Sequence, residues 1–195
     1  MKKTAIITIV ATALTVSVIV FSTKVSSDSY PKTSPVPSPS VVEVPHKPQI
    51  ANIPLSQETT DYLWKKSMES NFSYELLLAI AKQESVFNAR LISRSGDYGL
   101  MQLRPSTARW IAKQLGVSNY NLLDYKTNID FAVYYLSYLR QYWDTKGLSG
   151  NLLTDRVILS YNKGIQGASS YVSYHKANSS YVYNVRLYQH QFENR

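Results

Sequence analysis

The chain has 195 residues and no cysteine, and its formal net charge is +8. The missing cysteines exclude disulfide bonds and thiolate metal sites, and the length suits one ordinary domain with extensions. The positive charge fits either plain solubility or attraction to an anionic polymer such as a bacterial wall. The sequence has no zinc-ligand spacing, RNP-like motif or basic zipper, so no nucleic-acid partner is expected.

The first 24 residues are typical of an export signal or a membrane anchor. Lys2 and Lys3 precede twenty uncharged residues, 4–23, rich in Ala, Ile and Val. A spanning helix needs about 20 apolar residues, whereas a cleavable signal has an apolar core of about 7 to 15. The length favours an inner-membrane anchor, but several threonines dilute the hydrophobicity and Val20-Phe21-Ser22 resembles a cleavage site. Either way, the positive N-terminal flank predicts that the rest of the chain is periplasmic or otherwise extracytoplasmic.

Residues 25–54 are predicted to form a disordered linker. Seven of the eight prolines lie here, among Ser, Lys and Val: Pro31, Pro35, Pro37, Pro39, Pro45, Pro48 and Pro54. Proline fixes φ and cannot donate a backbone hydrogen bond, so the segment should be extended and solvated. It would tether the following domain to the N-terminal segment.

Residues 55–195 are predicted to form a single, mainly α domain. We expect helices over 57–70 after Ser56, 74–86 after Ser73, 105–115 before Gly116, and 128–144, with two more after Gly150 and Ser180. Thr127 and Asp130 look like a capping box for the helix over 128–144. Residues 91–103 could hold a short irregular hairpin, and the domain has no internal repeats.

One acid in this domain is placed for chemistry. Leu77, Ile80, Ala81 and Glu84 fall at i, i+3, i+4 and i+7 of the helix over 74–86, so Glu84 shares its apolar face. Burial raises the pKa of a carboxyl group, as a general acid near neutral pH requires. The alternative is a half-exposed glutamate paired with Lys82 or Arg90.

The residues around Glu84 favour the catalytic interpretation. The ordered blocks are Glu84-Ser85, Ser93, Gly96, Gly99-Leu100-Met101-Gln102-Leu103 with Pro105 and Thr107-Ala108, Ser160-Tyr161-Asn162 with Gly164, and Tyr181-Val182 with Val185. Together they resemble the soluble-lytic-transglycosylase (SLT) domain family over about residues 53–188. The resemblance implies a goose-type, lysozyme-like fold and cleavage of peptidoglycan without a cofactor or a metal.

The resemblance also implies a mechanism. In this family one glutamate protonates the bond between N-acetylmuramic acid (MurNAc) and N-acetylglucosamine (GlcNAc), then deprotonates the muramyl 6-hydroxyl, leaving a 1,6-anhydro end. Glu84 would be that catalytic residue. The substrate-binding positions would be Ser93 to the acetamido group, Gly99, Met101 and Gln102 on the groove floor, Tyr161 within reach of Glu84, Asn162 on sugar, and Tyr181 at the far side.

The chain departs from the family pattern at two positions, and two alternative functions remain. Ser160 stands where the family usually has alanine, and Ala177 where many members have glutamate. A hydrolytic muramidase would use Asp97 as a second carboxylate, as ordinary glycosidases do. A wall-docking factor would instead serve a secretion, conjugation or pilus machine, because small anchored domains of this kind often accompany such machinery.

Overall fold

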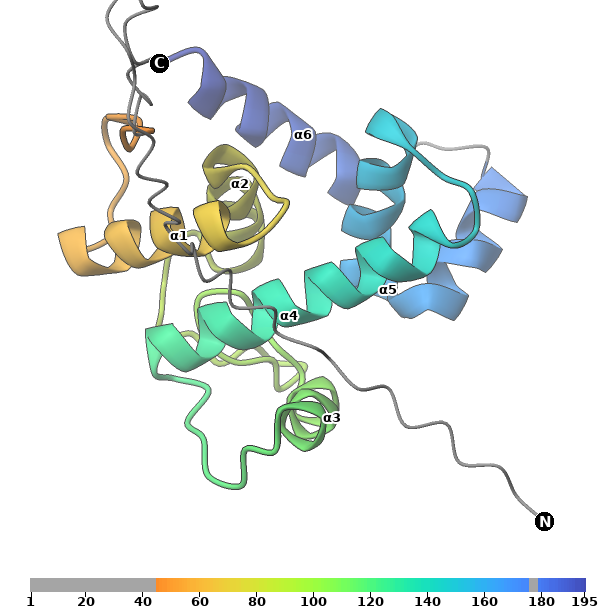
Figure 1. The fold of residues 1–195 in the computed structure, drawn as a ribbon, viewed down its shortest axis with the longest axis horizontal. Helices are drawn as coiled ribbons and strands as arrows, with labels where there is room; N and C mark the ends of the chain where they lie inside the picture. The colour runs from red at the N-terminus through yellow and green to blue at the C-terminus, as the bar shows by residue number, and fades with distance from the viewer. Residues whose placement is uncertain (1–44, 176–178) are drawn as a thin grey trace, which may run out of the picture. The chain divides into compact units, whose positions relative to one another are not determined.

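The computed structural model describes residues 45–175 and 179–195 of a chain that divides into two units, Met1–Val44 and Pro45–Arg195. The expected anchor or signal, the linker up to residue 44 and Ala177 lie outside the described residues. The described part of the second unit is built of six α-helices, as the sequence predicted (Figure 1). None of these helices is long and apolar enough to cross a membrane.

The first two helices begin where their serine caps predict. In α1 (Gln57–Glu69) the Ser56 hydroxyl accepts from the Thr59 amide at 3.3 Å, and in α2 (Tyr74–Ser85) Ser73 accepts from the Leu76 amide at 3.2 Å. Each bond satisfies an amide that has no partner inside the helix. Helix α3 (Pro105–Leu115) has proline at its first position and ends at Gly116, whose φ is 68°.

The predicted start of the helix over 128–144 was wrong. Helix α4 runs over Tyr125–Asp144, and its N-cap is Asp124 rather than Thr127. The Asp124 carboxylate accepts from both the backbone amide and the hydroxyl of Thr127, each at 2.9 Å. An ionised cap accepts stronger hydrogen bonds than a hydroxyl, and it suits the positive end of the helix dipole.

The last two helices begin at Gly150 and Ser180. Helix α5 (Gly150–His175) is interrupted at Gly164, whose φ of 68° and ψ of 168° are not helical, and α6 covers Ser180–Glu193. Residues 91–103 form two isolated antiparallel bridges, Ile92 with Tyr98 and Tyr98 with Leu103, instead of a regular hairpin. The connection between α2 and α3 is therefore an irregular loop.

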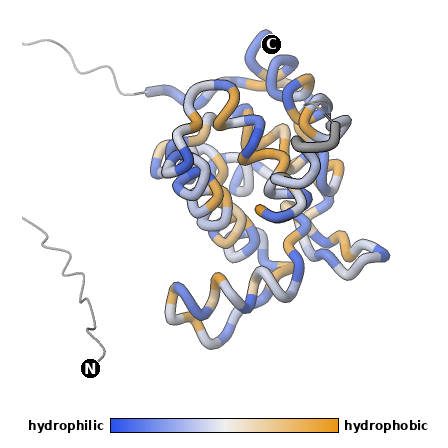
Figure 2. The backbone as a smooth tube through the Cα atoms, turned by 90° about the vertical axis from the view of Figure 1, so that its right-hand side faces the viewer, coloured by the Kyte–Doolittle hydropathy of each residue, from blue (hydrophilic) through white to orange (hydrophobic). Residues whose placement is uncertain are grey.

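Helix α2 lies at the centre of the packing. Its residues from Leu76 to Ala81 are at most 4 % exposed, and it packs against α1 and α6 (Figure 1). Helix α4 packs against α1, α3 and α5. Hydrophobic and hydrophilic residues alternate along the helices (Figure 2), so each helix can turn an apolar side to the common core.

The C-terminal end of the expected linker contacts this unit. Ile50 and Ile53 pack against the core, and the Lys47 ammonium lies 2.5 Å from the Asp61 carboxylate on α1. Residues 45–54 thus cover part of the helical unit instead of extending away from it. Isoleucines 50 and 53 are the physical reason, since apolar side chains gain free energy by leaving water.

Ser160, one of the departures from the family pattern, has a structural partner. It is fully buried on α5, and its hydroxyl accepts the indole N–H of Trp143 from α4 at 2.8 Å. An alanine would leave that buried N–H without this partner. The Ser160–Trp143 pair therefore joins α4 to α5 by a polar contact inside the core.

We predict that Ser160→Ala lowers the free energy of unfolding by about 1–3 kcal/mol, the cost of an unsatisfied buried donor. Urea denaturation at constant pH measures this change. In the matched background Trp143→Phe, which has no indole N–H, the same substitution should cost less than in wild type. Equal costs in the two backgrounds would show that the hydrogen bond contributes nothing.

Candidate active site

Glu84 lies in the last turn of α2, immediately before a sharp reversal of the chain. Val86 and Phe87 both have left-handed backbone conformations, with φ of 51° and 67°. This conformation is rare for a β-branched residue such as Val86. The reversal is held by Ser85, whose hydroxyl donates to Ala81 O at 3.1 Å and to Leu100 O at 2.7 Å. It turns the chain into the loop that leads to α3.

The Glu84 carboxyl is half-buried and has an altered pKa. Burial raises the pKa from 4.5 to about 7, the Tyr181 hydroxyl lowers it by donating a hydrogen bond to Glu84 Oε1, and the negative charge of Asp97 raises it. Burial outweighs the hydrogen bond because removing a carboxylate from water favours the neutral acid. Both protonation states are then populated near neutral pH.

No cation pairs with Glu84 among the described residues. The Lys82 ammonium, one expected partner in the alternative interpretation, lies 4.2 Å from the centre of the Tyr188 ring. Tyr181 is the polar neighbour of the acid, and burial together with Glu84 keeps its own pKa well above 10. Tyr181 therefore stays a hydrogen-bond donor at the pH where Glu84 titrates.

The segment 99–101 is buried beside Glu84 and held by side chains from three helices. Asn128 of α4, fully buried, accepts from the Met101 amide at 2.7 Å and donates to Tyr98 O and Leu122 O at 2.8 and 3.0 Å. The Tyr161 hydroxyl donates to Met101 O at 2.8 Å. With Ser85 on Leu100, these bonds satisfy backbone groups that water does not reach.

Gly99 is required at its position for two reasons. Its φ is +79°, and a Cβ atom there would lie 2.5 Å from both Asn128 Nδ2 and Leu122 O. Any side chain would therefore displace the amide that holds the loop. Gln102, with φ of 48°, follows, and its side-chain amide donates to Gly99 O at 2.8 Å and Leu91 O at 3.1 Å.

Ser93 belongs to a small polar turn instead of lying free. Its hydroxyl accepts from the Asp97 amide at 3.0 Å and lies 2.9 Å from the Ser95 hydroxyl. The Asp97 carboxylate in turn accepts from Ser95 at 2.7 Å and from Arg104 Nε at 3.2 Å. Asp97 is thus tied into the loop on both of its oxygens.

A pocket of about 280 Å³ opens in front of Glu84. Its lining comes from the α2 end, the loop, α3, α4 and the break in α5: Glu84, Asp97, Gln102, Leu103, Arg104, Ser106, Thr107, Tyr135, Tyr161, Asn162, Lys163 and Gly164. The non-helical backbone at Gly164 explains why Asn162 and Lys163 border the pocket from within a helix. The arrangement offers the Glu84 acid, amides, hydroxyls and the charged side chains of Asp97, Arg104 and Lys163 to a polar ligand.

The predicted site residues fall into three groups. Glu84, Gln102, Tyr161 and Asn162 line the pocket; Gly99 and Met101 are buried behind it; and Ser93 and Tyr181 contact lining residues. Tyr161 was expected within reach of Glu84 and lines the same pocket, but its hydroxyl donates to Met101 O, and the hydrogen bond to Glu84 comes from Tyr181. The expected groove floor of Gly99 and Met101 supports the pocket rather than lining it.

Asn128 and Tyr135 were missed by the sequence analysis. Both lie on α4, a helix for which the sequence analysis named no site residue. An asparagine within an apolar helical stripe is a usable signal, because buried amides need several partners. Among the described residues, no cluster of His, Asp and Glu could hold a metal ion.

The family model for the transglycosylase SLT domain matches residues 61–184. The chain belongs to this family. The matched region contains every predicted site residue, from Glu84 to Tyr181.

Several lytic murein transglycosylases are similar to parts of this chain. The chain is 41 % identical over 68 residues to the soluble lytic murein transglycosylase of Escherichia coli K12, covering 33 % of this chain and 10 % of that protein. It is 33 % identical over 129 residues to membrane-bound lytic murein transglycosylase E of Buchnera aphidicola, covering 59 % of each. The chain thus spans about a tenth of the soluble E. coli relative.

Solved structures agree with the family. The 70-kDa soluble lytic transglycosylase of E. coli matches with a TM-score of 0.59 and 26 % identity, covering 73 % of this chain and 25 % of that one. A complex of the 70-kDa soluble lytic transglycosylase with bulgecin A matches equally well. The lysozyme-like SLT fold predicted from the sequence is confirmed.

The raised pKa of Glu84 predicts a pH dependence of stability for this SLT domain. Between about pH 4.5 and 7 the native Glu84 holds a proton that the unfolded chain has released, so this group destabilises the fold as the pH rises. Glu84→Gln should remove the effect, up to about 3 kcal/mol. The free energy of unfolding of the variant relative to wild type should therefore grow from about pH 4 to about pH 8; a constant difference would mean that Glu84 titrates normally.

Proposed function

We propose that this chain is a peptidoglycan lytic transglycosylase in which Glu84 is both the general acid and the general base. The observation that carries the proposal is the half-buried Glu84 carboxyl group, whose pKa burial raises to about 7, at the wall of a polar pocket. The murein transglycosylases among the relatives support the same reaction. This activity is proposed for the whole chain, and the SLT family model matches residues 61–184 of it.

The first step uses the protonated form of Glu84. The acid gives its proton to the oxygen between MurNAc and GlcNAc, the bond from this oxygen to the muramyl C1 breaks, and the GlcNAc end leaves as an alcohol. The N-acetyl group of the substrate stabilises the positive charge at C1. A pKa close to the working pH makes proton transfer in both directions efficient.

The second step uses the carboxylate that remains. Glu84 takes the proton from the muramyl 6-hydroxyl, whose oxygen bonds to C1 and closes a 1,6-anhydro ring. Glu84 is then protonated again and no water is consumed. Tyr181 stabilises the carboxylate between the steps through its hydrogen bond to Oε1.

The other predicted side chains receive supporting roles. Asn162 and Gln102 border the pocket and would contact sugar, while Ser93 and Tyr161 hold the loop that carries Gln102. The Asp97 carboxylate accepts hydrogen bonds from Arg104 and Ser95. It is therefore not available to activate a water molecule or to stabilise the positive charge at C1 of the sugar. This arrangement favours the transglycosylase over a muramidase, which needs a second working carboxylate.

We expect Glu84→Gln to fold and to lose wall-degrading activity by at least about 10²- to 10⁴-fold, because an amide cannot transfer the proton. The matched control is Asp97→Asn, the other carboxyl at the pocket, which should keep most activity. Release of muropeptides from purified sacculi measures both variants. Activity of Glu84→Gln within a few fold of wild type would mean that the acid is structural.

The released products separate the two enzyme classes. A transglycosylase yields muropeptides that are one water lighter than hydrolysis products and are not reduced by borohydride. Reducible products of full mass, together with an inactive Asp97→Asn variant, would assign the protein to the muramidases. Mass spectrometry with and without borohydride treatment makes the distinction.

We further propose that residues 1–24 place the SLT domain outside the cytoplasm, as an inner-membrane anchor or a cleaved signal, and that residues 25–44 form a tether. Lys2 and Lys3 before the uncharged stretch 4–23 support this orientation. A role beside a secretion, conjugation or pilus machine would fit an anchored wall-cutting domain. A reporter fused after Pro54 should be active outside the cytoplasm; activity restricted to the cytoplasm would contradict the placement.

A further inference from the structure

A second hollow of about 270 Å³ adjoins the Glu84 pocket on the side of α3 and α4. It is lined by Ser106, Thr107, Trp110, Tyr135 and Tyr138. Three of these residues, Ser106, Thr107 and Tyr135, also line the pocket of Glu84. The two spaces are therefore neighbours with a common wall, and a chain-like ligand bound in one can continue into the other.

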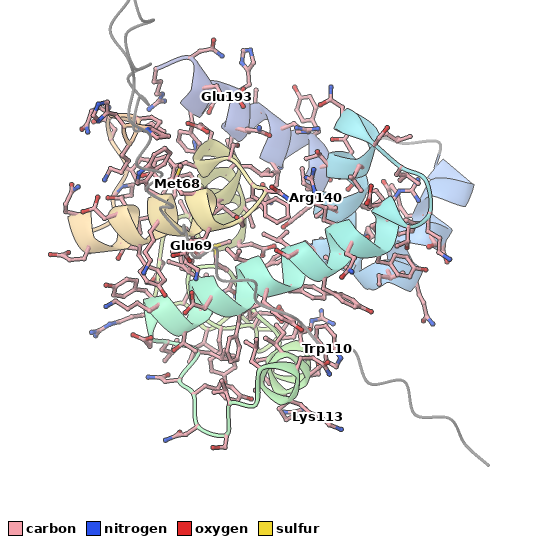
Figure 3. All side chains as sticks on the ribbon, in the orientation of Figure 1. Met68, Glu69, Trp110, Lys113, Arg140 and Glu193 are labelled. Atoms are coloured by element: carbon pink, nitrogen blue, oxygen red, sulfur yellow. The ribbon has the colours of Figure 1, made fainter. Side chains whose placement is uncertain are left out.

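The wall of this second hollow is aromatic. The Trp110 and Tyr138 ring centres are 4.7 Å apart at an interplanar angle of 60°, and the Trp110 ring also contacts Tyr134 and Tyr135 at 6.0 and 6.3 Å. Trp110 projects from α3 towards α4, whereas Lys113 projects away from it (Figure 3). Trp110 is half-buried and Tyr138 is 39 % exposed, so this aromatic shelf of Trp110, Tyr135 and Tyr138 meets solvent.

The chemistry of the aromatic shelf fits a sugar ring. A pyranose has an apolar face of C–H groups that packs on an aromatic ring, and its hydroxyls need polar partners at the edge. Ser106 and Thr107 provide hydroxyls beside the rings. None of the described residues that line the hollow is charged, so the carboxylates and amines of a peptide would find no oppositely charged partner among them.

We propose that the aromatic shelf is an accessory sugar subsite, in which an N-acetylhexosamine of the same glycan strand stacks on Trp110 while the strand's scissile bond lies at Glu84. This inference rests on the proposed function and extends it to a residue that the reaction itself does not need. The shelf would keep the scissile bond of a long strand next to the Glu84 carboxyl group. It would act on binding and on catalytic efficiency, not on the protonation of Glu84.

The first experiment compares variants of the full chain on glycan strands freed of peptides. Trp110→Ala should reduce kcat/KM by about 5- to 10-fold, the range of one aromatic contact, and Trp110→Phe should stay within about 2-fold of wild type. Trp110→Leu keeps an apolar side chain against Tyr134 and Tyr135 but lacks a flat ring, and it should behave like the alanine variant. The control Tyr183→Ala removes an aromatic ring that is 67 % exposed on α6, outside both hollows, and should change nothing.

Two results would overturn the subsite. Wild-type efficiency in both Trp110→Ala and Trp110→Leu would show that the shelf binds nothing that matters to cleavage. A defect seen only on intact sacculi, and absent on peptide-free strands, would assign the shelf to the stem peptides instead of the sugars. In both cases the proposed transglycosylase activity of the wild type would stand.

A second experiment tests the shelf independently of catalysis. The hexamer of N-acetylglucosamine is titrated into Glu84→Gln, with and without the additional change Trp110→Ala, and binding is followed by calorimetry. Affinity should fall about 5- to 10-fold in the double variant, and equal affinities would overturn the proposal. Because this readout needs no cleavage, it remains decisive even if the wild type releases no muropeptides and the proposed function fails.

Discussion

The geometry of the site depends on how the segment 99–101 is closed onto the helices around it. Ser85 from α2, Asn128 from α4 and Tyr161 from α5 each hydrogen-bond a backbone group of Leu100 or Met101. Leaving one of these buried groups without a partner would cost about 1–3 kcal/mol. The three bonds therefore fix three helices around one short segment. Glu84 is adjacent to Ser85, so its place at the pocket follows from the same closure.

This closure explains features that seem unrelated in the sequence. Asn128 can reach Tyr98, Met101 and Leu122 because α4 already begins at Tyr125, so that Asn128 lies within its first turn at full burial. Gly99 must lack a Cβ because the Asn128 amide occupies that space. The early Asp124 cap, the glycine and the buried asparagine are thus one arrangement. A change at any of the three would reach the acid through the loop.

The sequence predicted what local signals determine. Ser56, Ser73 and Gly116 act within three or four residues of the helix ends that they set, and the helical period placed Glu84 on the apolar face. The prediction failed for the start of α4, where Thr127 was expected as the cap but Asp124 accepts from both the amide and the hydroxyl of Thr127. Local signals also could not tell which tyrosine meets Glu84. Tyr181 is 97 positions away from Glu84, and the competing Tyr161 is engaged by Met101, a contact that only the folded chain reveals.

The electrostatics of the site show why the pKa of one acid is raised in a chain with more cations than acids. Arg104, a cation that lines the pocket, is paired with Asp97 at 3.2 Å, and the Lys163 ammonium lies 5.2 Å from the Tyr171 ring. Burial is the main cause of the raised pKa of Glu84, and the negative charge of Asp97 adds to it by repelling the Glu84 carboxylate. Through this repulsion Asp97 supports the neutral form of Glu84 without touching the reacting atoms. An acid beside the active site can therefore shift the pKa of the catalytic group by its charge alone, and a count of carboxylates at the pocket would mistake it for a second catalytic group.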